Sequence, residues 1–233
     1  LGNNDRFGIS VSSVGDLDGD GVVDLVVGSD MDDDGGSDRG AVYILFLNAD
    51  GTVKAEQKIS STQGGLDGPL GDDDWFGSSV SGLGDVDGDG LDDVLIGAIY
   101  ARDSGFSTGK TYLMLGSDVV AMPSGSVRSV ADASYTFVGE PAILELAGWS
   151  VASAGDVDGD GRPDVLIGAP GNKDKGCCRT GKAYVMLAST IAAAPTGTSF
   201  ALAEASYSFV GETSTDEAGY SVASAGDVDG DGR

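Results

Sequence analysis

The sequence has no histidine, only two cysteines and few basic residues, and these shortages exclude several classes of function. Without histidine, the chain cannot form a Ser–His–Asp triad, a Cys–His pair or a histidine-ligated zinc site. It has 13 lysines and arginines against 38 aspartates and glutamates, so its formal net charge is −25. A surface this acidic repels nucleic-acid phosphates and anionic membranes. Cations or basic partners are its natural counterparts.

Long apolar runs and a recognisable leader are also missing. No apolar stretch reaches the roughly 18 residues that would indicate a membrane-spanning helix. The first eight residues are neither basic nor apolar, which excludes a signal peptide there, and the lack of an initiator methionine favours a fragment of a longer chain. Cys177 and Cys178 are adjacent, and neighbours rarely bond because the small ring is strained. We expect them to be free or to pair outside this chain, and they do not indicate a compartment.

Glycine and aspartate are in excess, and they occur in a repeated segment. The chain has 39 glycines, and its apolar fraction of 40% is enough for a core. One acidic segment occurs four times, with its leading aspartates 69, 71 and 71 residues apart. The copies are GDLDGDGVVDLVVG at 15–28, GDVDGDGLDDVLIG at 84–97, GDVDGDGRPDVLIG at 155–168 and GDVDGDGR at 226–233.

The segments around each copy predict short β-strands. Apolar residues alternate with small or polar ones in 7–15. In the segment at 24–28, the residues that follow Asp24 form a continuous apolar run, as in a strand buried on both faces. Further strands are predicted at 40–47 and 57–64, with equivalents in the later repeats. Helical periodicity is largely absent; residues 141–149 could form one helical turn at most.

Four antiparallel strands in about 70 residues predict an all-β chain built as a β-propeller, one blade per repeat. A β-solenoid is the less favoured alternative because its coils are usually shorter, and a β-sandwich does not repeat one motif four times. The expected blades are 1–69, 70–140, 141–212 and the start of a fourth at 213–233.

This repeat length gives about three and a third blades, which is too few to close a ring. We therefore interpret the chain as part of a larger propeller, whose remaining blades would be its partners. An open arc leaves exposed strand edges, so we expect the isolated chain to associate or to be only marginally stable.

The repeated loop, Asp-x-Asp-Gly-Asp-Gly-x-x-Asp, predicts a cation site. Carboxylates at alternate positions of a tight turn can converge, and the glycines let the backbone turn. Such carboxylates need a counter-charge, and calcium accepts six to eight oxygens in flexible geometry. The seventh residue would contribute its backbone carbonyl. The predicted ligands are Asp16, Asp18, Asp20, Val22 and Asp24; Asp85, Asp87, Asp89, Leu91 and Asp93; Asp156, Asp158, Asp160, Arg162 and Asp164; and Asp227, Asp229 and Asp231 in a fourth, incomplete site.

Two other interpretations of this loop are less favoured. An EF-hand needs a glutamate at position twelve, where Val27, Ile96 and Ile167 stand, and the residues that follow predict a strand rather than a helix. A solvated acidic turn would use Asp and Gly for turn chemistry alone, but four copies with one spacing argue against it. The other acidic runs, 29–38 and 71–75, are expected to be solvated loops.

These motifs resemble the FG-GAP repeats of integrin α-subunit propellers and of their bacterial relatives. Phe7-Gly8 and Phe76-Gly77 match the first half of the motif, and Gly168-Ala169-Pro170 matches the second. Gly148-Trp149 and Gly219-Tyr220 depart from Phe-Gly but keep an aromatic residue. The resemblance implies a seven-bladed propeller with calcium in the loops between blade strands.

The resemblance and the loops together predict a calcium-binding, non-catalytic module, extracellular or at the cell surface, that serves adhesion. Its protein or glycan partner would meet the variable loops at 29–39, 99–108 and 170–180. Two alternatives stay open: a propeller accessory to a hydrolase domain outside this chain, as in the phospholipase D that cleaves glycosyl-phosphatidylinositol anchors, or a structural spacer. Neither nucleic-acid binding nor membrane insertion is expected.

Overall fold

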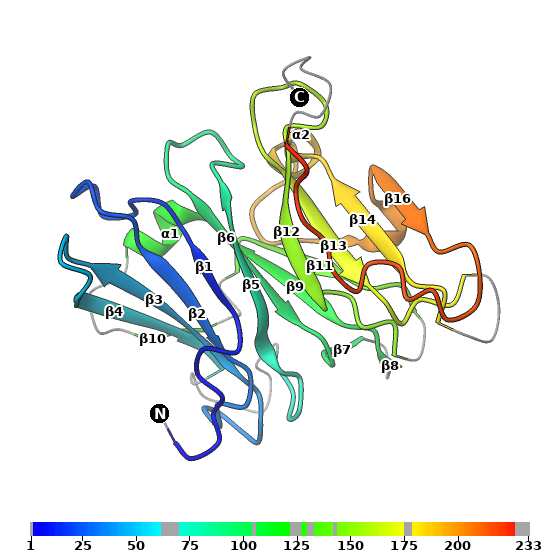
Figure 1. The fold of residues 1–233 in the computed structure, drawn as a ribbon, viewed down its shortest axis with the longest axis horizontal. Coiled ribbons are helices and arrows are strands. Elements are labelled where there is room, and N and C mark those ends of the chain that lie inside the picture. The colour runs from blue at the N-terminus through cyan, green and yellow to red at the C-terminus, as the bar shows by residue number, and fades with distance from the viewer. Residues whose placement is uncertain are drawn as a thin grey trace.

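The chain forms three main β-sheets, each built on four antiparallel strands, that stand side by side like the blades of a fan (Figure 1). The computed structural model describes residues 2–61, 70–103, 106–121, 127–129, 133–141, 144–174 and 179–226. The architecture is an all-β, partial β-propeller with few helices. In each sheet the first strand lies next to the first strand of the neighbouring sheet, so that the three first strands line one side of the fan.

The first two sheets are each a meander with a fifth strand added. The first has the order β1-β2-β3-β4-β10 and the second β15-β11-β9-β6-β5. The strands of the first are β1 (Val11–Ser13), β2 (Leu25–Ser29), β3 (Ala41–Leu47), β4 (Val53–Ser60) and β10 (Val127–Ser129). Those of the second are β5 (Phe76–Gly84), β6 (Asp93–Ala98), β9 (Lys110–Met114), β11 (Tyr135–Val138) and β15 (Thr198–Ala201).

The third sheet has four strands in the order β12-β13-β14-β16. These are β12 (Ser150–Gly155), β13 (Asp164–Ala169), β14 (Lys182–Met186) and β16 (Tyr207–Val210). A small hairpin of β7 (Arg102–Asp103) and β8 (Phe106–Ser107), two short helices, α1 (Gly116–Val120) and α2 (Ala188–Ala192), and the 3-10 turn η2 (Leu202–Glu204) complete the described elements. No helix in the described ranges has the length and apolarity needed to span a membrane.

The predicted four-stranded meander is confirmed, and the fifth strands are an addition to it. β10 and β15 each come from the following repeat and pair in parallel with the outer strand of the preceding sheet, β4 or β11. They link neighbouring blades at the outer edge. The short helices α1 and α2 were not expected, because five residues are too few to show a helical period.

The first strand of the first repeat is shorter than predicted. The prediction covered 7–15, whereas β1 has only three residues. In the second repeat, β5 extends over nine residues and packs between its neighbours. In the first repeat, Phe7 and Val11 are 44% and 55% exposed, so packing supports the strand from one side only.

The apolar core lies between the sheets in two clusters. One packs the first sheet on the second around Ile44, Phe76 and Tyr112. The other packs the second on the third around Phe137 and Tyr184. The strands between these clusters, such as β6, are buried on both faces, which accounts for their continuous apolar runs.

A pair of glycines forms the joint between consecutive blades. A Cβ at Gly97, at the end of β6, would lie 2.2 Å from the carbonyl oxygen of Gly148, which begins the next repeat. Gly28 meets Gly77 in the same way, at 2.0 Å. The two halves of the Phe-Gly and Gly-Ala-Pro pattern thus contact each other across the blade boundary, where only glycine allows the backbones to approach.

Candidate metal sites

The repeated acidic loop connects the first and second strands of each sheet at one edge of the fan (Figure 1). In the first loop, the carboxylate of Asp16 accepts hydrogen bonds from the backbone amides of Gly19, Asp20 and Gly21 at 2.7–3.0 Å. Gly19 and Gly21 have φ of 77° and 87°, a conformation that favours glycine. Asp85 and Asp156 make the same three bonds in their own loops.

The ninth aspartate of each loop is buried and joins three parts of the blade. Asp24 is fully buried and directly precedes β2. Its Oδ2 accepts the amide of Leu17 in the loop and its Oδ1 accepts the amide of Leu47 at the end of β3, both at 3.0 Å. Asp93 and Asp164 repeat this pattern, with their Oδ1 atoms accepting the amides that begin α1 and α2.

Three of the four predicted carboxylate ligands in each loop converge. Ligand oxygens of the first, third and ninth residues lie within 4.8 Å of one another. Oxygens bound to one calcium ion at 2.3–2.6 Å cannot be more than about 5.2 Å apart, so this spacing fits a single ion. The converging groups are Asp16, Asp18 and Asp24; Asp85, Asp87 and Asp93; and Asp156, Asp158 and Asp164.

The electrostatics of these groups would favour a bound cation. Burial raises the pKa of the ninth carboxyl in all three loops, to about 7 for Asp93. Backbone amides oppose this rise, whereas the neighbouring carboxylates of the same loop, such as Asp87, add to it. A divalent ion between the three carboxylates would remove the repulsion and hold all of them ionised.

The other predicted ligands lie differently. The fifth aspartates, Asp20, Asp89 and Asp160, lie outside the converging groups. In each, Oδ1 accepts the amide of the seventh residue, which is Val22, Leu91 or Arg162. The predicted ligands of the fourth loop, Asp227, Asp229 and Asp231, lie outside the described residues, and so do Cys177 and Cys178.

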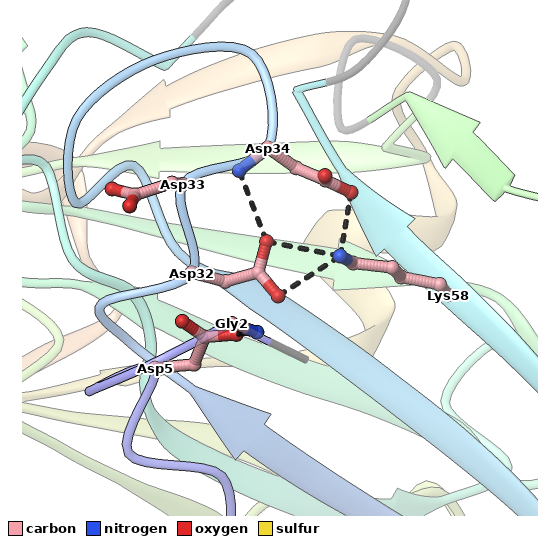
Figure 2. Close-up of a pocket in the computed structure, with 6 residues that line it drawn as sticks. All are labelled: Gly2, Asp5, Asp32, Asp33, Asp34 and Lys58. Carbon is pink, nitrogen blue, oxygen red and sulfur yellow. Dashed lines mark hydrogen bonds and ion pairs between the residues drawn. The ribbon is translucent and has the colours of Figure 1, made fainter.

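The acidic run at 29–38 is not simply solvated, contrary to expectation. Figure 2 shows Asp32 beside the ammonium group of Lys58, which lies 2.9 Å from both of its carboxylate oxygens. Tyr43 donates its hydroxyl to Asp32 at 3.1 Å, and Asp34 pairs with the same lysine. Asp32 is only 2% exposed, and these partners offset the cost of burying its charge. With Asp5 and Asp33, these acids border a pocket of about 230 Å³.

The run at 71–75 also contains a buried acid, Asp74, which belongs to a second repeated motif. One acid precedes the repeat glycine by three residues in all four repeats: Asp5, Asp74, Glu145 and Asp216. Each lies between two non-glycine residues with positive φ. Asp74 and Asp216 accept the amide of the residue three positions earlier, at 2.6 and 2.7 Å. Their constant spacing could have revealed this motif in the sequence.

Glu145 is the exception among these four acids. It is fully buried, and its Oε1 accepts the Tyr184 hydroxyl at 2.5 Å and the Asn172 amide at 3.1 Å. Its Oε2 is buried without a hydrogen-bond partner. Burial raises the pKa of Glu145 to about 7.

A second pocket lies where the blades meet, at the end of the sheets opposite the acidic loops. It has a volume of about 240 Å³ and contains Trp75 and Trp149. The guanidinium of Arg6 lies 5.6 Å from the Trp75 ring centre and 3.4 Å from the buried carboxylate of Asp30. We call this the blade-junction pocket. It combines aromatic side chains with charge, as binding sites often do.

Comparison with known proteins agrees with this geometry. The family model of the FG-GAP repeat matches residues 7–45, 76–114 and 147–186. The chain is 37% identical to integrin alpha-PS5 of Drosophila melanogaster over 166 residues, 33% identical to integrin alpha ina-1 of Caenorhabditis elegans over 172, and 31% identical to human integrin alpha-7 over 163.

These alignments cover 70–71% of this chain but only 12–15% of the relatives. The chain thus spans about a seventh of the length of these integrin alpha chains. Within that span, the matched repeats begin near the Phe-Gly position and include the acidic loop. The chain belongs to the FG-GAP repeat family of integrin alpha-like β-propellers.

Proposed function

We propose that the chain is a calcium-binding propeller module of an extracellular or cell-surface protein, and that it serves adhesion. One observation carries the calcium assignment: three carboxylates converge in the same way in three separate loops. A loop that served only to turn the chain would not need to bring three carboxylates together, and this arrangement occurs in all three loops.

The ions would be held by this chain's own loop residues. The first, third, fifth and ninth aspartates of each loop would supply carboxylates and the seventh residue its carbonyl, as set out above. Calcium would supply positive charge that ties the loop to the buried ninth aspartate. Because that aspartate also holds the end of the third strand, filling the site would stiffen the whole blade edge.

The first experiment measures calcium dependence of the fold. Melting in about 1–10 mM calcium, compared with EGTA, should show that each filled site adds roughly 0.4–1.4 kcal/mol. Replacing the third aspartate in all three loops, D18N/D87N/D158N, should abolish the difference. Asp33→Asn, an exposed aspartate in the loop between β2 and β3, should leave it intact. Equal melting of the unmodified chain in calcium and EGTA would rule out the assignment.

We place the partner, a protein or a glycan, on the face that bears the loops between second and third strands. The blade-junction pocket lies on this face, and the integrin alpha relatives support a role in adhesion. A glycan array and a pull-down in calcium, each repeated with EGTA, test this placement. Trp149→Ala should reduce capture without lowering the calcium response. Failure to capture any ligand in either assay would favour a structural spacer instead.

A further inference from the structure

A lysine occupies the mouth of the first acidic loop. The ammonium of Lys54, at the start of β4, lies 2.7 Å from Oδ2 of Asp18 and also contacts Oδ2 of Asp20. These are the third and fifth residues of the loop, and both are predicted calcium ligands. The lysine therefore holds the carboxylates that the ion would need.

The other two described loops lack such a partner. Oδ2 of Asp158 in the third loop accepts the hydroxyl of Ser189 at 3.2 Å. Arg162 packs against Gly88 of the second loop, but no ion pair joins it to a carboxylate of the described residues. Among the described loops, only the first thus has a cation that forms ion pairs with its carboxylates.

The extra length of β4 explains this difference. The strand pairing aligns the first sheet with the third. Lys58 on β4 pairs with Tyr43, and Ser208 on β16 pairs with the equivalent tyrosine, Tyr184. Lys54, four residues before Lys58, therefore corresponds to residue 204, four residues before Ser208. β4 begins at Val53 and has eight residues, whereas β16 begins at Tyr207 and has four. The additional residues of β4 extend beside the end of β3, where the Leu47 amide donates to Asp24. This extension places Lys54 next to the acidic loop.

We infer that Lys54 is a built-in competitor of calcium, which makes the first site the weakest of the three and the last to fill. This rests on the proposed calcium function. An ammonium and a divalent ion about 5 Å apart repel each other enough, even at the dielectric constant of water, to weaken binding roughly tenfold. Without calcium, the same ammonium neutralises the first loop, so this loop depends least on the ion for its shape.

Glycine amides can report each loop separately. Gly21, Gly90 and Gly161 each donate to the first aspartate of their own loop, so their amide NMR signals will shift when that loop binds an ion. Calcium titration of the ¹⁵N-glycine-labelled chain should shift Gly90 and Gly161 at roughly tenfold lower calcium than Gly21. Lys54→Gln should bring the midpoint of Gly21 down to that of the other two.

Two control variants isolate the charge at this position. Lys54→Arg keeps a cation there, so Gly21 should stay the last to shift. Arg162→Gln removes a loop cation that forms no ion pair in the described structure, and it should leave Gly21 unchanged. Equal midpoints for all three glycines in the unmodified chain, or no effect of Lys54→Gln on Gly21, would overturn the inference and leave the calcium function standing. If none of the glycines responded up to about 10 mM calcium, both would fall.

Discussion

At the scale of single residues, the aspartates of one loop have different tasks. The ninth aspartate has both carboxylate oxygens occupied by backbone amides, whereas the third aspartate lies at the surface. With Asn at the ninth position, the side-chain NH₂ group would face a backbone N–H group, and two donors cannot form a hydrogen bond. The same change at the third position keeps an acceptor oxygen and removes only charge.

This difference gives a prediction for the third loop. Asp164→Asn should destabilise the fold by about 1–3 kcal/mol even in EGTA, because a buried amide loses its acceptor. Asp158→Asn should leave the EGTA melting curve nearly unchanged and weaken calcium binding instead. Urea unfolding with and without calcium separates the two effects. Equal behaviour of both variants in EGTA would show that the ninth aspartate has no structural task of its own.

Glu145 gives a second prediction at this scale, on pH. Its folded pKa is about 7, above the ordinary value of 4.5, because it is buried. The unfolded chain therefore releases this proton at lower pH than the folded chain, and the stability contributed by Glu145 is lost as pH rises from about 4.5 to 7.

Glu145→Gln, which stays neutral, should thus be more stable than the unmodified chain at pH 8, by on the order of 1–3 kcal/mol, and equal to it near pH 4.5. Thermal melting at fixed calcium across this pH range measures the difference. Glu212→Gln, at an exposed position, is the control and should give no such trend. An advantage of the Glu145→Gln variant that stayed constant with pH would contradict the buried ionisation.

At the scale of elements, the sequence predicted most of the sheets and the three loops with their convergent aspartates. Strands such as β6 were predictable because a continuous apolar run flanked by an aspartate loop permits little else. β10 and β15 were not, because each pairs with a strand far away in the sequence. Lys54 was also missed: its contact with Asp18 depends on the length of β4, and the sequence shows no periodic signal for it.

The glycine joints between blades give a prediction at this scale. Gly97→Ala should destabilise the fold by several kcal/mol, on the order of 2–4, because its Cβ would overlap a backbone carbonyl that cannot move without separating two sheets. Gly71→Ala is a suitable control, since its Cβ would meet nothing closer than 3.5 Å. Chemical denaturation of both variants checks this. A tolerated Gly97→Ala would mean that the blades slide over each other readily.

At the scale of the whole molecule, the repeats bury equivalent positions unequally. Phe137 on β11 is fully buried and stacks on Phe200 of β15, with ring centres 5.6 Å apart. Its counterpart on β16, Phe209, is 61% exposed, and Tyr207 is 48% exposed. The third sheet therefore exposes apolar side chains on its outer face. In the second sheet, the equivalent side chains are covered by β15. The first sheet likewise exposes Val11.

These two outer faces predict concentration-dependent self-association of the isolated chain. Burying one phenylalanine side chain contributes roughly 1.5–3 kcal/mol, so Phe209→Lys should weaken association by one order of magnitude or more. Phe106→Lys, which alters an exposed aromatic on the β7–β8 hairpin, should change it little. Light scattering across a concentration series, with calcium held constant, measures both variants. A monodisperse monomer at every concentration would contradict this prediction. It would mean that a second copy offers no complementary surface to the exposed aromatic side chains.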